Sequence, residues 1–306
     1  MSGRGRARGV LLGLALGDAL GAPFEGRSRV TGVQLDAWID AGEPLRWTDD
    51  THMALTLARH LVDDPELDDP QALGGAFARA YALEPWRGYG AGPPQVFAMV
   101  AQGMSFEEAA GTLFGGAGSF GNGAAMRVAP VGLLPAAIDP RRAARLAEVQ
   151  ARVTHTHPEA IDGATVIAQV IAGLLDLDKV DADAIVRVVS AAASRLSEGP
   201  VRDRLTGVVD VLASGGEPAM VVGRCGTGVA AAESVPAAIA ALLGGGDALR
   251  VVTTAIGFGG DTDTIAAMAG AMAGAAWGLE RMPGPLLDRL EARAELERLA
   301  DTLSCR

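Results

Sequence analysis

The chain has 306 residues, of which 49% are apolar, 4% are aromatic and 41 are glycine. It is long enough to bury one large core, and its many small side chains favour closely packed helices over a β-sandwich. The net charge of −11 argues against a nucleic-acid-binding surface, which requires clustered cations. The two cysteines, Cys225 and Cys305, form no CxxC pair, which is typical of a protein from a reducing compartment.

The N-terminus shares some features with a targeting signal. Arginines within residues 4–8 precede an apolar run over residues 10–16, as in a short signal peptide. Asp18 interrupts this run, however, and the apolar pattern continues through Leu20. We therefore expect a cytoplasmic protein whose residues 1–8 form a flexible N-terminus.

The apolar pattern predicts a first helix over residues 10–21. Its glycines at positions 13, 17 and 21 lie four residues apart, and such a seam lets another backbone approach closely. Residues 22–26 end this helix and include Glu25. The spacing alone favours a solvated loop glutamate at this position.

A cluster of oxygen-bearing side chains opens the next predicted helix. Asp49 and Asp50 follow Thr48 and precede apolar residues at helical spacing, namely Met53, Leu57 and Leu61. Aspartate and threonine at a helix start are also ordinary N-capping residues. One such cluster therefore does not distinguish a capped helix from a cation site.

Two glycine-rich segments come next in the chain. Residues 84–94 cannot form a regular helix, and they either connect two helices or line a pocket. Residues 114–123 contain five glycines, whose exposed N–H groups are suited to bind phosphate oxygens. Phe114 and Phe120 flank this loop as candidate stacking faces for a base. The segment is no Walker A motif, because the Gly-Lys-Ser/Thr ending is absent.

The remaining chain is mainly helical in pattern. Residues 154–158 contain two of the four histidines and fit either a hydrogen-bonding role in a polar site or a plain turn. Apolar spacing predicts helices over residues 161–177, 182–196, 201–212 and 237–243, and an amphipathic, solvated outer helix over 286–303. No fixed-period repeat or linker interrupts the sequence, so we expect a single domain over residues 1–306.

A second oxygen-rich cluster precedes the longest apolar stretch. Asp261 and Asp263 alternate with threonines before residues 265–279, a predicted helix too short to span a bilayer comfortably. Two carboxylates this close repel each other unless water or a cation neutralises them. Because residues 48–50 have the same composition, we interpret the clusters as two halves of one site. Four carboxylates are enough to hold two hard divalent cations.

Taken together, these motifs resemble those of one known family. In chain order they are Leu16-Gly17-Asp18-Ala19-Leu20-Gly21 with Glu25, Thr48-Asp49-Asp50-Thr51, residues 118–127, Thr154-His155 and Gly260-Asp261-Thr262-Asp263-Thr264. This is the pattern of the ADP-ribosylglycohydrolases of the dinitrogenase-reductase-activating type, and the resemblance covers residues 9–280. Residues 87–92 with Val96-Phe97 look most like the branch that cleaves O-linked ADP-ribose: poly(ADP-ribose), serine-ADP-ribose and O-acetyl-ADP-ribose. The arginine-specific branch is the close alternative.

The resemblance implies an all-α fold, in a single compact orthogonal helical domain, with two Mg²⁺ or Mn²⁺ ions. The implied metal ligands are Thr48, Asp49, Asp50, Asp261, Asp263 and Thr264. The implied catalytic residues are Glu25, on a mobile loop that assists proton transfer, together with Asp49 and Asp263. The implied substrate-binding residues are Phe114, Gly118, Ser119, Phe120, Gly121, Asn122, Gly123 and His155.

Within this set, the resemblance gives each group a part of the substrate. Residues 118–123 would hold the diphosphate, His155 would contact it or the nearby ribose, and Phe114 and Phe120 would sandwich adenine. Phe120 departs from a tyrosine that is common in the O-linked branch, which keeps the stacking face and removes one hydroxyl contact.

Three classes of function remain open at this point. The first is a metal-dependent ADP-ribosyl hydrolase, acting as a monomer on ADP-ribosylated proteins without membrane or nucleic-acid partners. The second is a non-catalytic relative, either an ADP-ribose-binding module or a crystallin-like protein, and the intact metal ligands with Glu25 speak against it. The third is an unrelated Mg²⁺-dependent phosphohydrolase, which would release phosphate in place of ADP-ribose.

Overall fold

The computed structural model describes residues 3–305, and over this range the chain is all α-helical without β-strands. The helices surround one hydrophobic core, which confirms the predicted all-α fold in one compact domain. The helices are α1 (Gly3–Gly21), α2 (Gly32–Asp40), α3 (Asp49–Asp63), α4 (Pro70–Leu83), α5 (Gly92–Val100), α6 (Phe106–Gly116), α7 (Gly123–Met126), α8 (Ala129–Gly132), α9 (Pro140–Arg152), α10 (Pro158–Leu175), α11 (Ala182–Arg195), α12 (Pro200–Ala213), α13 (Pro218–Cys225), α14 (Ala231–Leu243), α15 (Ala248–Gly257), α16 (Thr262–Trp277), α17 (Gly284–Leu287) and α18 (Arg293–Ser304), with the 3-10 helices η1 (Ala22–Phe24), η2 (Pro135–Ile138) and η3 (Leu279–Arg281).

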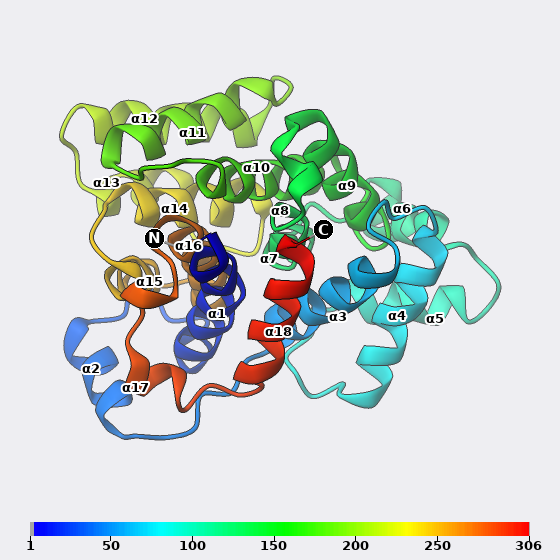
Figure 1. Ribbon diagram of the computed structural model, residues 1–306. Helices are drawn as coiled ribbons and strands as arrows, with labels where there is room; N and C mark the ends of the chain where they lie inside the picture. The colour runs from blue at the N-terminus through cyan, green and yellow to red at the C-terminus, as the bar shows by residue number, and fades with distance from the viewer. Residues whose placement is uncertain (1–2, 306) are drawn as a thin grey trace.

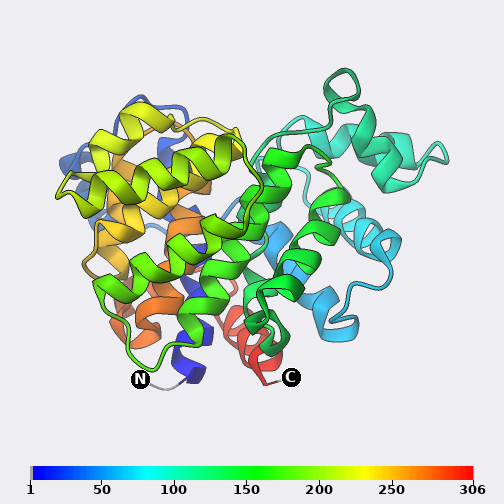
Figure 2. The same ribbon diagram turned by 90° about the horizontal axis from the view of Figure 1, so that it is seen from above.

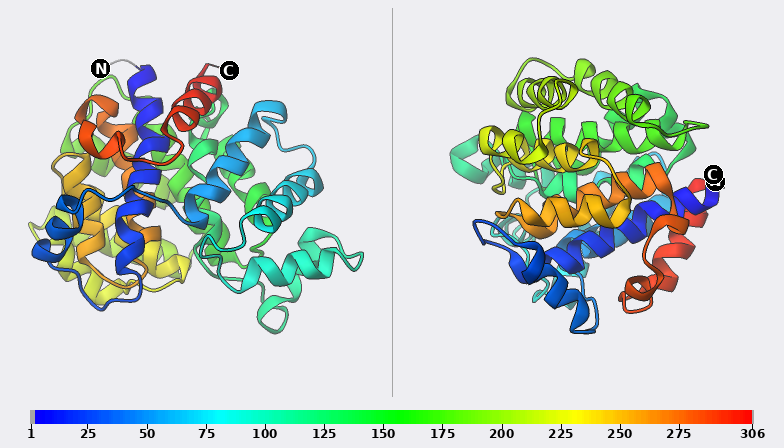
Figure 3. Two further views of the ribbon diagram at one scale, coloured as in Figure 1. Left: turned by 90° about the horizontal axis from the view of Figure 1, so that it is seen from below. Right: turned by 90° about the vertical axis from the view of Figure 1, so that its left-hand side faces the viewer.

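Helices α1 and α16 form the centre of the molecule (Figure 1). They run side by side, with α1 drawn in blue and α16 in orange (Figure 3). Residues 262–276 of α16 are all buried, as expected for a helix that is apolar or small on every side. The remaining helices pack around this pair, so α4–α6 lie at one end of the molecule and α11–α13 at the other (Figure 2).

Glycines permit the close approach of the two central helices. A Cβ atom on Gly13 would collide with the carbonyl oxygen of Gly270, and one on Gly17 with that of Ala266. Likewise, a Cβ on Gly9 would lie 2.7 Å from the carbonyl oxygen of Gly274. The glycine seam predicted from the sequence is confirmed, and it brings the C-terminal end of α1 against the start of α16.

The prediction of a flexible N-terminus over residues 1–8 is wrong for residues 3–8, which form the first turns of α1. Arg6 donates a hydrogen bond from Nη1 to the carbonyl oxygen of Leu174, at 2.9 Å. Arg8 pairs with Asp301 of α18, with 2.7 Å between Nη2 and Oδ2. These partners lie far away in the sequence, so the local pattern of small and basic residues did not reveal them. Residues 1 and 2 lie outside the described residues.

The predicted start of the helix at 237 is also wrong. Helix α14 begins at Ala231 and contains Pro236. A proline inside a helix leaves the carbonyl four residues earlier without its usual donor. Here that carbonyl, on Ala232, accepts a hydrogen bond from Nη1 of Arg204 at 2.8 Å, which allows the helix to continue.

The C-terminal tail is two helices, and the single outer helix predicted over 286–303 is wrong. Between α17 and α18, Leu290 forms an isolated parallel bridge with Leu45. Helix α18 is amphipathic as predicted, but its apolar face is buried on α1 and α3 through Leu296, Leu299 and Leu303.

Two segments are long and apolar enough to span a membrane by length and composition. They are residues 3–24 and α10, and 83% and 67% of their most apolar windows are buried inside the protein. Burial of this extent is typical of the core helices of globular domains, which pass the same test.

Candidate active site

One cavity of about 400 Å³ brings most of the predicted site residues together. Its lining includes thirteen of them, namely Glu25, Asp49, Asp50, Asp261, Asp263, Thr264, Phe114, Ser119, Phe120, Gly121, Asn122, Gly123 and His155. We call the part of the lining formed by the carboxylates the carboxylate end. We call the part formed by the rings of Phe114 and Phe120 the aromatic end. Thr48 and Gly118 lie close by without lining the cavity.

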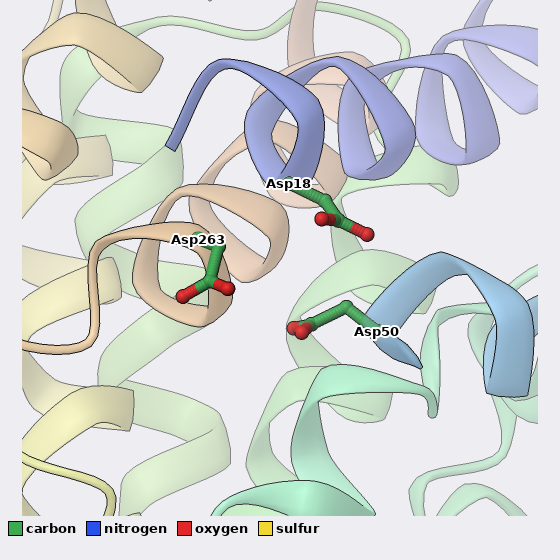
Figure 4. A group of neighbouring side chains, drawn as sticks. All are labelled: Asp18, Asp50 and Asp263. Atoms are coloured by element: carbon green, nitrogen blue, oxygen red, sulfur yellow. The ribbon is translucent and has the colours of Figure 1, made fainter. Parts of the chain in front are cut away.

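Three buried aspartates meet at the carboxylate end. Asp18 comes from α1, Asp50 from the first turn of α3 and Asp263 from the first turn of α16, and their side chains face a common space (Figure 4). One carboxylate oxygen from each lies within 4.8 Å of the others. Asp50 and Asp263 were predicted as metal ligands, whereas Asp18 was not assigned a role.

Asp18 holds the first acidic segment in place. Its carboxylate accepts hydrogen bonds from the backbone N–H of Thr48 at 2.9 Å and of Thr51 at 3.0 Å. The hydroxyl groups of the same two threonines also donate to it, at 2.9 and 2.6 Å. The sequence signal for this role was the position of Asp18 inside the apolar run 16–20. A fully buried carboxylate requires hydrogen-bond donors of this kind.

A second acidic group lies beside the first and shares Asp263. Glu25, Asp261 and Asp263 each offer one oxygen within 4.8 Å of the others. The turn that carries Glu25 is anchored: Gly26 donates from its backbone N–H to the carbonyl oxygen of Gly260 at 2.8 Å, and Gly260 donates to that of Arg27 at 2.7 Å. In this conformation the turn holds Glu25 beside Asp261 and Asp263.

Burial and mutual repulsion perturb the carboxyl groups. Burial, then the charge of Asp261, raises the pKa of Asp263 to about 9, and burial, then the charge of Asp18, raises that of Asp49 to about 7. The pKa of Asp50 is raised well above its usual range, mainly by burial and then by Asp18. Burial and like charges thus disfavour the ionised carboxylates at this end, and a nearby cation would favour them.

The donor set fits divalent cations. Oδ1 of Asp50 is buried and has no hydrogen-bond partner in the described part of the chain. Its other oxygen accepts weak contacts from the hydroxyl groups of Thr48 and Thr264, both at 3.3 Å. Carboxylate and hydroxyl oxygens without nitrogen or sulfur are the ligands that Mg²⁺ and Mn²⁺ prefer. An orphaned oxygen that faces other carboxylates is what such a cation would satisfy.

The aromatic end is built on a strained loop. Phe114 has φ of +51°, which is uncommon for a residue with a side chain, and it ends the regular part of α6. Phe114 is 61% exposed and its ring centroid lies 5.3 Å from that of Phe120. Two stacking contacts need about 7 Å between the outer rings. The rings therefore touch each other here, and the predicted adenine sandwich requires them to separate.

The loop between the two ends is pinned by its glycines. Gly118, at φ of +75°, packs so tightly on Thr156 that a Cβ atom would collide with its hydroxyl group. A Cβ on Gly123 would lie 2.8 Å from Cε1 of His155. Burial lowers the pKa of His155 to about 3, so its imidazole is neutral. The backbone N–H of Ser119 donates to no partner within residues 3–305 and is available for a ligand.

Asn122 contributes to the acidic cluster as well as to the loop. Its Nδ2 donates hydrogen bonds to Oδ2 of Asp261 at 2.5 Å and to Oγ of Ser234 at 3.0 Å. Its backbone N–H donates to the carbonyl oxygen of Val229 at 2.9 Å. The predicted substrate-binding residue thus positions a predicted metal ligand.

Arg127 lines the cavity and had no assigned role. Its guanidinium is fully buried, lies over the ring of Phe77 with 4.5 Å to the centroid, and donates to the side chain and backbone oxygens of Gln150 at 2.8 and 2.7 Å. Burial lowers its pKa to about 9, which leaves it a cation near neutral pH. Its only signal in the sequence was its place at the end of the motif 118–127.

The all-α fold with two acidic helix starts around one cavity defines the class, and the chain belongs to the ADP-ribosylglycohydrolase family, whose model matches residues 2–305. The chain is therefore a hydrolase of this family. It is 32% identical to ADP-ribosylhydrolase ARH3 of Gallus gallus over 345 aligned positions, which cover 97% of this chain and 92% of that protein. It is also 32% identical to an uncharacterized protein of Archaeoglobus fulgidus, over 97% of this chain and 95% of that one. A solved structure described as an ADP-ribosylglycohydrolase-related protein complex matches it with a TM-score of 0.77 at 28% identity, covering 99% and 98% of the two chains.

Proposed function

We propose that the protein is a metal-dependent hydrolase that releases ADP-ribose from O-linked substrates. The observation that carries this proposal is the meeting of two acidic groups and a glycine-rich, aromatic loop in one cavity. The carboxylates suit a pair of Mg²⁺ or Mn²⁺ ions, and the loop suits a diphosphate and a base. A cavity of about 400 Å³ lies in the range that ligand sites occupy.

The residues divide the work along the cavity. Thr48, Asp49 and Asp50 would hold one ion, and Asp261, Asp263 and Thr264 the other. When bound, such ions would orient ribose hydroxyl groups, offset the negative charge that develops on the departing oxygen and lower the pKa of a water molecule. Asp18 fixes the first ligand set through its hydrogen bonds to the backbone.

Glu25 is placed to move a proton. Glu25 is partly shielded from water, and this partial burial, then the charge of Asp261, raises its pKa, which brings the carboxyl group closer to the pH at which it can both hold and release a proton. The neutral imidazole of His155 and the free N–H of Ser119 would contact the diphosphate. Phe114 and Phe120 would stack on adenine after their rings separate.

The preference for an oxygen linkage rests on residues 87–92 with Val96-Phe97, which resemble the O-linked branch. The loop is held close to the carboxylate end. Tyr89 bonds through its hydroxyl group to Nδ1 of His52 at 2.9 Å, and Arg87 donates to the carbonyl oxygen of Trp47 at 3.0 Å. These contacts support a role for the loop beside the acceptor group.

The test is release of ADP-ribose from serine-linked and arginine-linked peptides and from O-acetyl-ADP-ribose, with and without EDTA. We expect release from the oxygen-linked substrates that is lost in EDTA and restored by Mg²⁺ or Mn²⁺. Release from arginine alone would refute the branch assignment. Release of inorganic phosphate, or activity that persists in EDTA, would refute the metal-dependent glycohydrolase.

A further inference from the structure

A second cavity adjoins the carboxylate end and is not explained by the proposed chemistry. This outer groove encloses about 460 Å³ and is lined by Arg46, Trp47, Thr48, Glu84, Trp86, Arg87 and Gly88. Gly88 lines both cavities, and a Cβ atom on it would lie 3.6 Å from Oδ1 of Asp49. Phe114 and Phe120 line the first cavity and not the outer groove. The outer groove therefore begins beside Asp49, where the scissile bond would lie, and away from the rings proposed for the first adenine.

The free groups in the outer groove are an aromatic face and a cation. Trp86 is 73% exposed, although a side chain of this size is usually covered. Arg46 is exposed and makes no hydrogen bond or ion pair with any of residues 3–305. By contrast, Arg87 is fully engaged, with 2.7 Å to Glu291, 2.6 Å to Glu84 and 3.9 Å from its guanidinium carbon to the ring of Trp47. The acid of the groove, Glu84, is thus paired, while the cation Arg46 is not.

An exposed indole beside an unpaired cation matches a nucleotide. Bases stack on aromatic side chains irrespective of their identity, and phosphates pair with arginine. Next to the groove, the backbone of Leu45 is already paired: Leu45 donates to the carbonyl oxygen of Arg289, and Glu291 donates to that of Leu45, both at 3.0 Å. Leu45 therefore offers no strand-like pairing to a peptide.

The chemistry of a polymeric substrate places a nucleotide at this position. In poly(ADP-ribose), the anomeric carbon of one unit is joined to the 2′-oxygen of the adenosine in the next unit. Hydrolysis forms a bond from a water oxygen to that carbon and breaks the bond to the 2′-oxygen, which receives a proton. The leaving unit thus carries its adenine within one ribose of the reaction centre.

Resting on the proposed hydrolysis of O-linked ADP-ribose, we propose that the outer groove binds the leaving ADP-ribose unit of a poly(ADP-ribose) chain. Its adenine stacks on Trp86, and its diphosphate lies near Arg46. The groove thereby favours polymer over substrates whose leaving group carries no nucleotide.

The experiment compares kcat/KM on short poly(ADP-ribose) and on O-acetyl-ADP-ribose. Trp86→Ala should lower kcat/KM on polymer by about tenfold, since stacking on an aromatic side chain contributes to that order. It should leave kcat/KM on O-acetyl-ADP-ribose unchanged, because the leaving group of that substrate is acetate and carries no nucleotide. Trp86→Phe should recover most of the loss, and Arg46→Ala should lower polymer cleavage more at low salt than at high salt. Met220→Ala, another exposed apolar side chain outside both cavities, is the control and should change neither rate.

Each other result overturns the proposal. Equal loss on both substrates would make Trp86 a support of the active site, and no loss on either would leave the groove without a role. Loss on a serine-linked peptide without loss on polymer would assign the groove to the polypeptide acceptor. If the wild-type protein cleaves none of these substrates, the proposed function fails separately. The affinity of short poly(ADP-ribose) for wild type and Trp86→Ala, measured by calorimetry, then decides, because equal affinities would exclude a nucleotide on Trp86.

Discussion

The two ends of the cavity are built from different kinds of structure. At the carboxylate end, Asp18, Asp50 and Asp263 are buried and project from packed helices. At the aromatic end, Phe114 and Phe120 are exposed and belong to a loop with positive φ angles. Clustered charges oppose folding, so their positions need the large free energy of helix packing. Aromatic faces carry no such cost and can sit on a segment that adjusts to its ligand.

This difference predicts that substitutions at the carboxylate end reduce turnover more than substitutions at the aromatic end. Asp263→Asn removes a charge shared by both acidic groups, and metal affinity and turnover should each fall by more than about a hundredfold, since even second-shell partners contribute up to that order. Metal titration monitored by ADP-ribose release measures both. In EDTA the variant should melt no lower than wild type, because Asp263 with a pKa of about 9 is already neutral there. Full activity of this variant at limiting metal would rule out the dinuclear site.

Glu25 tests whether the exposed acid of the same end acts in chemistry or in binding. Glu25→Gln keeps the shape and hydrogen bonding of the side chain but cannot cycle a proton. Turnover on serine-linked ADP-ribose should fall by about a hundredfold. The affinity for free ADP-ribose, measured by calorimetry with Mg²⁺, should change only modestly. Wild-type turnover in this variant would make Glu25 a solvated loop residue, as its spacing alone suggested.

The scaffold of the carboxylate end can be tested without touching a ligand. Gly13→Ala forces α1 away from Gly270 of α16, and we expect a loss of about 3 kcal/mol in the free energy of unfolding. Because Asp18 and Asp263 lie on these two helices, metal affinity should fall as well. Denaturant unfolding and metal titration provide the two readouts.

Gly111→Ala is the matched control, since a Cβ atom there would meet nothing within 4 Å. Replacing this helical glycine by alanine should raise the free energy of unfolding of the protein by up to about 1 kcal/mol, and metal affinity should not change. If both variants behaved alike, the glycine seam would not be what holds the acids together.

The smallest effect should come from the aromatic end. At a concentration about a hundred times Kd, ADP-ribose with Mg²⁺ should add roughly 2.7 kcal/mol to the stability of the wild-type protein. Phe114→Ala should weaken binding about tenfold, which leaves roughly 1.4 kcal/mol at the same concentration. Without ligand its melting temperature should stay unchanged, because the side chain is exposed. Thermal melts give both values, and Ile138→Ala, exposed on η2, is the control. If ADP-ribose did not change the melting temperature of the wild-type protein, the assignment of this cavity as its binding site would be contradicted.

The sequence by itself determined the helical fold, the glycine seam and the two acidic helix starts. These features depend on residues within a few positions of one another, where apolar spacing, small side chains and helix-start chemistry are visible locally. The same holds for the glycine-rich loop, whose motif also carried the resemblance to the family.

Only the tertiary structure decided which groups serve each other across the chain. In the sequence, Asp18 is only a charged residue within an apolar helix. The structure shows that Thr48 and Thr51 donate hydrogen bonds to it. Residues 3–8 were expected to be flexible because the partner of Arg8, Asp301, lies at the other end of the sequence. Likewise, the unpaired state of Arg46 beside Trp86 follows from what surrounds them in space. Pairing between residues far apart in the sequence depends on how the helices pack. A local sequence pattern therefore does not reveal which distant residue becomes the partner.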